Sequence, residues 1–571
     1  MVTQASITKF GERKSDALLA KGCKRREVLM SLNRREFIGA ASGAALAAAA
    51  TANASAQTGT PNAAFSIDDA FVVFMRDIGG TPADGGGKVT FTGSDPILRS
   101  HFRIGTSMAL PAMAVGVGAA AVWKERTGEG QDIHVDLREA VYNVNPMMTP
   151  IMQFRLAAGR VPSDDPVARG FTFMPTINQR YYQAPLGVGN PFSFVPYETK
   201  DGRYMNITGV YPHLQQRALI LLGAVPTRES ITRAVKKWNA LELDNAMAEA
   251  RAVGGIHRTA EEWLAIPEGK LLASVRVIDI RKVGDSAPMP FPSNPAQPLS
   301  GIKGLALTHV IAGSVAARIL CEYGADVLQI AKDQAFEHEA LWTDCNVGMR
   351  STFLDLTKAD QAAALSALLP QADVFMDSFS GRGIERLGFG VEEVASKKPG
   401  IVYLTVRAYG WDGPWMNRAG FDMEALSVTG YTYAEGGRVP HLPPTFLEYQ
   451  GGSVVPAFPP TMVLNDYIAG YMGAAGVLAA LRRRAREGGS YHVRVSLSRA
   501  AMWYQSLGQF PTTDVDTSNP DHRMVPPESV TGTTCYGELT RLAPLAKLSR
   551  TPGRWHNPLL VVRGGDKPVW T

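Results

Sequence analysis

Two segments far apart in the chain share one pattern of apolar and polar residues. Residues 102–141 and 461–501 each begin with a long run rich in Ala and Gly, pass through a charged turn that contains Gly, and end in a stretch with apolar residues at every second position. The run favours a buried helix, and the alternation over residues 133–137 and 493–497 is typical of a strand. The pattern therefore predicts a duplicated helix–strand unit.

The two units differ at the start of the helix. When they are aligned on their strands without gaps, Asp466 of the later unit stands opposite Thr106 of the earlier one. The helix dipole favours an ionised carboxylate at this position, although an aspartate there is also a common helix cap. We therefore expect one working copy, with Asp466 at its centre, and one supporting copy.

A second pattern, of strands alternating with helices, follows a Pro-rich stretch at residues 288–298. Apolar residues at helical spacing predict a helix over 313–323. Short apolar runs predict strands at residues 304–308, 325–330, 372–376 and 401–406. This alternation predicts a doubly wound parallel sheet, whose ligands bind at the carboxyl ends of the strands. The loop at 309–314 has a single Gly and no GxGxxG motif, which disfavours a nicotinamide-dependent dehydrogenase.

These patterns divide the chain into five parts. We expect a leader over residues 1–56, a linker over 57–98, a partial copy with a small α/β domain over 99–287, the Pro-rich linker over 288–298, and a large α/β domain over 299–571. Within the small domain, Asp201-Gly202 between two apolar runs predicts a hairpin turn. The Pro-rich linker is the clearest of the predicted boundaries.

The leader resembles a twin-arginine export signal. Arg34-Arg35 precede a weakly apolar run at residues 39–52 and a small-x-small cleavage site at 54–56. Such a signal predicts export to the periplasm and a mature chain that begins near Gln57. An ordinary N-terminal helix with two basic residues is the other interpretation.

Composition disfavours several classes of partner and cofactor. The net charge of +5 arises within residues 1–56, which hold nine basic and four acidic side chains, so we expect no nucleic-acid partner. The four Cys show no CxxC spacing, so we expect neither a zinc site nor a disulfide scaffold. Residues 104–122 are uncharged over about the length of a membrane helix. Because Pro111 and many Ala and Gly residues make this stretch only weakly hydrophobic, we expect a buried helix and no membrane span.

Short motifs in the large domain carry a resemblance to a known family. They stand in order at residues 298–303, 312–313, 323–327, 346–351, 354–356, 377–380, 385–388, 409–414 and 420–422, with further matches at 542–544 and 549–552. Together they resemble the class III CoA-transferases of the CaiB/BaiF type, and residues 99–285 resemble another piece of the same family. The resemblance implies a Rossmann-like doubly wound α/β fold, acyl-CoA and a carboxylic acid as substrates, and no metal or tightly bound cofactor. Members form interlocked dimers, so we expect a homodimer or a pseudo-dimer within one chain.

The resemblance also assigns roles to particular residues. Asp466 falls at the position of the family's catalytic aspartate, a carboxylate nucleophile that attacks the thioester and forms a mixed anhydride. The residues expected to contact coenzyme A are Ala312, Gly313, Arg318, Arg350, Phe379, Arg386, Tyr409 and Gly410, with Arg382 as a further candidate for its phosphates. Trp411, Trp415 and Trp503 are candidates for an acyl pocket, although aromatic residues at such positions are more often part of the core.

Two other functions remain open. The α-methylacyl-CoA racemases of the same superfamily use a His–Asp pair, but the His position is Phe421 here, which cannot act as a base. Met349 stands where the family often has a Lys for the CoA phosphates, and Ser378 replaces the Asn of an Asn-Phe pair. A non-catalytic acyl-CoA or carboxylate binder is therefore the second alternative. The export signal favours this binder, because CoA is scarce outside the cytoplasm, whereas CoA chemistry implies a cytoplasmic location.

Overall fold

The computed structural model describes residues 65–570, apart from residues 158, 160, 182–189, 193–194, 334 and 437–455. The described residues all belong to one compact unit. The predicted leader at 1–56 lies outside them. The Pro-rich segment at 288–298 contains no helix or strand, and the domain boundaries placed around it remain predictions.

A seven-stranded sheet forms the centre of the later half. Its order is β11-β10-β9-β12-β13-β14-β8, in which the first six strands are parallel and β8 runs antiparallel to β14. The strands are β8 (Ile278–Gly284), β9 (Lys303–Leu307), β10 (Asp326–Ala331), β11 (Arg350–Phe353), β12 (Val374–Asp377), β13 (Val402–Arg407) and β14 (Ser490–Ser496). The six parallel strands follow the order of a doubly wound sheet. The predicted α/β class with a parallel sheet is therefore confirmed.

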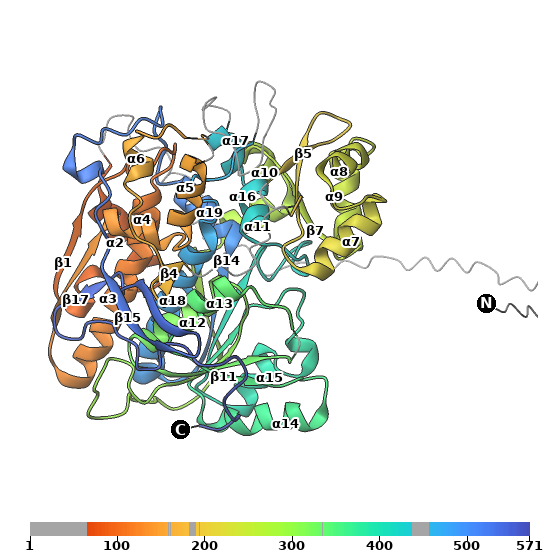
Figure 1. The fold of residues 1–571 in the computed structure, drawn as a ribbon. Helices are drawn as coiled ribbons and strands as arrows, with labels where there is room; N and C mark the ends of the chain where they lie inside the picture. The colour runs from red at the N-terminus through yellow and green to blue at the C-terminus, as the bar shows by residue number, and fades with distance from the viewer. Residues whose placement is uncertain are drawn as a thin grey trace, which may run out of the picture. The chain divides into compact units, whose positions relative to one another are not determined.

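The helices that follow these strands pack closely. They are α12 (Ala312–Glu322), α13 (Glu339–Cys345), α14 (Ala359–Leu368), α15 (Val391–Lys397), α16 (Asp422–Val428), α17 (Tyr431–Gly436), α18 (Asn465–Glu487) and α19 (Leu497–Gln505). Helix α18 packs against α12 (Figure 1). A Cβ on Gly470 of α18 would lie 2.7 Å from the Cβ of Val315 and 2.9 Å from the Ala312 carbonyl oxygen. The Ala and Gly content of α18 thus permits an approach that larger side chains would block.

The N-terminal part has a three-stranded sheet with a similar order of elements. Strands β1 (Gly86–Thr92) and β2 (Gln131–Asp136) are parallel, and α3 (Ile104–Thr127) connects them, as α18 lies between β13 and β14 in the chain. Strand β17 (Lys547–Leu548) pairs antiparallel with β2, as β8 does with β14. Where a linker was expected over 57–98, the described residues form α2 (Ile67–Asp77), a short 3-10 turn and β1.

Helix α3 is the one described helix that is long and apolar enough to cross a membrane. Within it, 94% of the most apolar window is buried inside the protein. It packs against α18 (Figure 1). The prediction that this stretch is a buried helix is confirmed.

The described residues form two further small sheets, and the second of them joins distant parts of the chain. One contains β5 (Pro196–Glu198), β6 (Tyr204–Thr208) and β7 (Val253–Ile256), with α7 (Pro212–Leu222), α8 (Arg228–Val235) and α9 (Ala240–Glu249) beside it. Strands β5 and β6 are antiparallel around Gly202, whose φ is +76°, so the predicted hairpin is confirmed. The other sheet pairs β15 (Ser529–Thr534) and β16 (Gly537–Leu542) with β3 (Thr176–Ile177) and β4 (Arg180–Tyr181).

The remaining helices complete the N-terminal half. They are α4 (Leu137–Asn143), α5 (Met148–Ala157), α6 (Pro166–Arg169), α10 (Ala260–Ala265) and α11 (Pro267–Ser274). Helix α4 begins at the end of β2, where the Asp136 carboxylate accepts the Arg138 N–H at 2.8 Å and caps the helix. The N-terminal half therefore contributes both the α3 unit and the small β5–β7 unit to the protein.

Candidate active site

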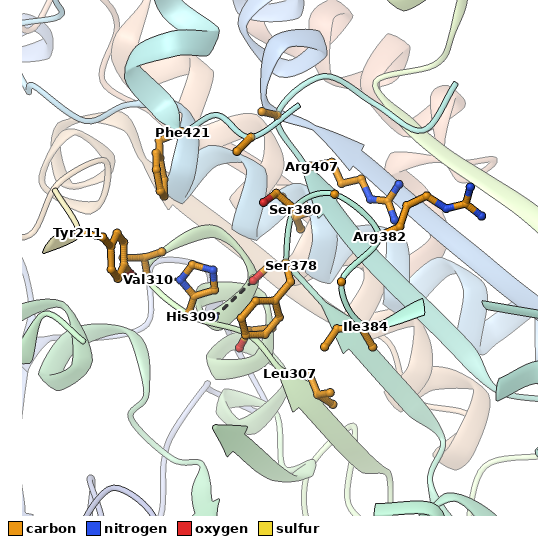
Figure 2. A pocket seen from close by; sticks show the side chains of 18 of the residues that line it. Tyr211, Leu307, His309, Val310, Ser378, Ser380, Arg382, Ile384, Arg407 and Phe421 are labelled. Carbon is orange, nitrogen blue, oxygen red and sulfur yellow. Dashed lines mark hydrogen bonds between the residues drawn. The ribbon is translucent and has the colours of Figure 1, made fainter. Parts of the chain in front are cut away.

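A cavity of about 1240 Å³ lies at the carboxyl ends of the parallel strands. Leu307 of β9, Ala331 of β10 and Arg407 of β13 are the last residues of their strands and line it, and Ser378 directly follows β12. Figure 2 shows Leu307, Ser378 and Arg407 around this space. Ligands bind at this edge of doubly wound sheets, so the cavity is the candidate active site.

Asp466 lines this cavity as the second residue of α18. The position of Asp466 suggested a helix cap, but Asp422 caps the start of α18 instead. The carboxylate of Asp422 accepts the backbone N–H of Leu464 at 3.1 Å and that of Asp466 at 3.0 Å. Within the described part of the chain, no hydrogen bond contributes to the pKa of the Asp466 carboxyl group. Its carboxyl group is thus available at a helix N-terminus, whose dipole favours negative charge.

Three carboxyl groups near the start of α18 resist ionisation. Burial raises the pKa of Asp466 well above its usual range, and the Asp422 and Glu424 carboxylates raise it further. Burial also raises the pKa of Asp422 to about 7, although backbone N–H groups partly oppose the shift. The pKa of Glu424 rises to about 7 through burial, against hydrogen bonds from Thr208 and Asn206, both at 2.5 Å. In a low dielectric, the charge on Asp422 therefore opposes ionisation of Asp466.

Most of the residues predicted to contact CoA line the cavity with Asp466. They are Ala312, Gly313, Phe379, Arg386, Tyr409 and Gly410, together with Arg382. A Cβ on Gly313 would lie 2.7 Å from the Cβ of Ser378 and 2.8 Å from Cγ2 of Thr308. The start of α12 therefore sits directly against the loop after β12, and only Gly fits there without a shift.

Two of the predicted contacts lie elsewhere. Arg318 is 2% exposed, and its guanidinium donates to Asp344 Oδ2 at 2.9 Å. Arg350 pairs with Asp326 at 3.0 Å and donates to the Val569 carbonyl at 2.8 Å. Neither arginine lines the cavity. Sequence alone gave no sign of their carboxylate partners, which come from α13 and β10.

Arg407 lines the cavity and was not predicted. Its Nε is buried and has no hydrogen-bond partner among the described residues. Burial lowers the pKa of its guanidinium, and the nearby Asp377 carboxylate partly offsets the effect. Figure 2 shows Arg407 close to Arg382 on one side of the cavity. Its place at the end of a predicted strand was the signal that could have identified it.

Tyr211 brings the N-terminal half into the site. It precedes α7 of the small β5–β7 unit and lines the cavity. Its hydroxyl lies 3.2 Å from His309 Nδ1 and 3.3 Å from Glu337 Oε1. No sequence pattern indicated this contact, because Tyr211 lies about one hundred residues before His309.

The three Trp candidates for an acyl pocket lie outside the cavity. Trp415 packs on Tyr409, with ring centroids 5.0 Å apart. Trp503 packs on Phe74, and the indole of Trp411 donates to Thr405 at 2.6 Å. Trp415 therefore packs behind a residue that lines the cavity, whereas Phe74 and Thr405 do not line it. Within the described residues, no group of three or more His, Cys, Asp or Glu side chains is placed to hold a metal ion.

The chain is similar to several known proteins. Residues 299–531 match the model of CoA-transferase family III. Over 340 residues the chain is 32% identical to the acetyl-coenzyme A transferase nodX of Hypoxylon pulicicidum, covering 55% of this chain and 54% of that protein. It is 29% identical over 232 residues to the alpha subunit of succinyl-CoA–L-malate CoA-transferase from Chloroflexus aurantiacus, covering 38% of this chain and 50% of that subunit.

Among solved structures, a hypothetical protein of Mycobacterium tuberculosis is 29% identical to the chain, with 38% of this chain and 57% of that one covered and a TM-score of 0.32. The chain spans about half the length of the curated relatives it matches. The matched residues contain strands β9 to β14 and the start of α18 with Asp466. Residues 299–531, which hold most of the cavity lining and Asp466, are therefore similar to CoA-transferase family III.

Proposed function

We propose that the protein is an acyl-CoA:carboxylate CoA-transferase with Asp466 as its nucleophile. The observation that carries the proposal is the position of Asp466. Its carboxyl group lines the cavity at the N-terminus of α18, while Asp422 accepts the backbone N–H groups there. Among the described residues, none donates a hydrogen bond to the Asp466 carboxylate. An unshielded carboxylate of raised pKa is well suited to attack a thioester.

The reaction that follows balances without an external acid or base. A carboxylate oxygen of Asp466 attacks the thioester carbonyl, the C–S bond breaks, and a mixed anhydride and CoA thiolate form. The thiolate attacks the Asp466 carbonyl and releases the donor acid, which leaves an aspartyl-CoA thioester. The acceptor carboxylate then displaces the thiolate and forms a second anhydride. Attack of the thiolate on the acceptor carbonyl yields the new acyl-CoA and restores Asp466.

The charges of the cavity support one orientation for CoA. Arg382 and Arg407 lie on one side of the cavity in Figure 2, and Arg386 also lines the cavity. Guanidinium groups favour phosphates. The thioester then lies toward Asp466. Arg318 and Arg350 do not line the cavity, so the proposal leaves them out of the phosphate contacts, whereas Arg382 lines it although it also pairs with Glu385.

The arrangement of strands supports a pseudo-dimer within one chain. Strand β8, from before the Pro-rich segment, adds to β14, and β17, from near the C-terminus, adds to β2. Asp95 accepts the N–H of Thr106 at 2.7 Å and its hydroxyl at 2.8 Å, much as Asp422 accepts the N–H of Asp466. We therefore propose that the two copies form one interlocked body in which only the later copy is catalytic.

The test is capture of the covalent intermediate. The protein is incubated with an acyl-CoA and hydroxylamine, and peptides are analysed by mass spectrometry for a hydroxamate at Asp466. We expect the adduct in the wild type and in Thr106→Ala, the matched control from the other copy, and none in Asp466→Asn. If acyl-CoA binds but neither adduct nor exchange appears with any donor, the protein is a binder and the proposal is wrong.

A further inference from the structure

One end of the cavity is built of aromatic rings. Phe421, His309 and Phe379 line it with partly exposed rings. The ring centroids of His309 and Phe379 are 4.7 Å apart. Tyr211, which is 5% exposed, joins the rings: it is nearly parallel to Phe421 at 6.0 Å and stands edge-on to His309 at 5.8 Å. We call Phe421, His309, Phe379 and Tyr211 the ring face.

Tyr211 and Phe421 of the ring face lie near the proposed nucleophile and across the cavity from Arg382 and Arg407. Phe421 directly precedes the aspartate that accepts the Asp466 N–H, and the Asp466 charge acts on the Tyr211 hydroxyl. Figure 2 shows Tyr211 and Phe421 on one side of the pocket and Arg382 and Arg407 on the other. A CoA thioester with its phosphates at the arginines and its carbonyl at Asp466 would direct its acyl group toward the ring face.

Hydrogen bonds hold this face in place. Glu337 lies 3.3 Å from the Tyr211 hydroxyl and also accepts the N–H of His338 at 3.0 Å and that of Val310 at 3.5 Å. Val310 has a φ of +50°, which is costly for a β-branched residue and persists only where the surroundings impose it. The ring face is therefore preorganised, which favours binding of a rigid group.

The ring face carries little charge at neutral pH. Burial lowers the pKa of His309 to about 4, so its imidazole is neutral. Arg563, which also lines the cavity, donates to the Ala335 carbonyl and lies over the Trp342 ring at 6.0 Å. A second carboxylate on the acyl group would therefore meet uncharged rings, and the Arg563 guanidinium already has partners.

We propose that the ring face binds an aromatic acyl group, of the benzoyl or arylacetyl type, beside Asp466. This inference rests on the proposed CoA-transferase function and names the substrate class of the same site. Each well-placed ring pair is worth about a two- to tenfold change in affinity beyond the area it buries. Phe421, at the position where a racemase has its His, is then the residue that selects the acyl group.

The test measures acyl-CoA binding to the Asp466→Asn variant, in which we expect no turnover. By isothermal titration we expect benzoyl-CoA to bind about tenfold more tightly than acetyl-CoA or succinyl-CoA. Phe421→Leu in the same background, which keeps apolar volume but removes the ring, should abolish most of this advantage. Tyr211→Phe, which keeps the ring, should retain it. Equal affinities for the three thioesters, or tightest binding of succinyl-CoA, would overturn the inference.

Exchange assays with the wild type separate this inference from the function on which it rests. If acetyl-CoA or succinyl-CoA exchanges and benzoyl-CoA does not, the acyl class is wrong and the transferase function stands. If no donor exchanges but benzoyl-CoA binds most tightly through Phe421, the ring face is correct and the transferase function is wrong. Preferred exchange of benzoyl-CoA supports both the aromatic acyl class and the transferase function.

Discussion

At the scale of single residues, the pair Asp466 and Asp422 sets the pH range of the proposed reaction. The nucleophile must be ionised, and burial and the neighbouring carboxylate both raise its pKa. Because the pKa of Asp422 is itself about 7, we expect kcat/KM to rise with pH through the neutral range and to fall at acidic pH.

Asp422→Asn tests the origin of this dependence. The asparagine carbonyl can still accept the N–H groups of Leu464 and Asp466, but the like charge is gone. The acidic limb of kcat/KM should therefore move to lower pH, by about one unit. The measurement is kcat/KM between pH 5 and 9 with any donor that exchanges. If the acidic limb of kcat/KM does not move, Asp422 does not raise the pKa of Asp466.

The same shift predicts how stability depends on pH. A carboxyl group whose pKa is raised on folding binds its proton more tightly in the folded state, so its contribution is present below the unfolded pKa and is lost as pH rises through the folded pKa. Asp466 and Asp422 should thus destabilise the wild type progressively from about pH 4 upward. Asp466→Asn removes one charge, so its Tm should exceed that of the wild type by about 2 °C or more at pH 8 and by less at pH 5. A larger gain in Tm at pH 5 than at pH 8 would contradict a raised pKa for Asp466.

At the scale of elements, a buried charge cluster joins two helices and a strand to α18. Asp344 of α13 accepts hydrogen bonds from Arg318 of α12 at 2.9 Å, from Arg541 of β16 at 3.0 Å and from the Tyr467 hydroxyl of α18 at 3.0 Å. Tyr467 follows the proposed nucleophile, so the cluster also fixes the start of α18.

Asp344→Asn should therefore be strongly destabilising. The substitution leaves two buried guanidinium groups without their carboxylate, and we expect a loss of about 3–5 kcal/mol in the free energy of unfolding. Urea denaturation followed by circular dichroism measures it. Asp326→Asn, which breaks the partly exposed pair with Arg350, should cost about 1 kcal/mol or less. Similar losses in the two variants would contradict this account of the cluster.

The elements also show what the sequence could and could not predict. Strands β9, β10, β12 and β13 were predicted because each is a short apolar run between helices. Asp466 stood out as a lone carboxylate in a repeated apolar pattern, but the pattern alone is equally typical of a helix cap, and its role as the nucleophile came from the family resemblance and stays a prediction. The role of Arg318 could not be predicted. An arginine that pairs with a buried carboxylate, as Arg318 does with Asp344, looks the same in a sequence as one that faces a ligand.

At the scale of the whole molecule, the contacts between the two halves were beyond the reach of the sequence. Tyr211 reaches the cavity through the β5–β7 unit, and β8 and β17 each complete a sheet of the other half. Such pairings join residues more than two hundred positions apart in the chain, where local periodicity carries no information. The resemblance to an interlocked family suggested a pseudo-dimer, but it did not indicate which strands are exchanged.

This exchange predicts that the halves hold together without the covalent link between them. A protease site inserted within 293–296, in the exposed part of the Pro-rich segment, allows the folded protein to be cut there. We expect the two fragments to co-elute in size-exclusion chromatography and to retain acyl-CoA binding. Their separation would expose the edges of β14 and β2 and the buried faces of α3 and α18. The uncut protein with the same insertion is the control. Fragments that separate without denaturant would show that the linker, rather than the exchanged strands, holds the two halves together.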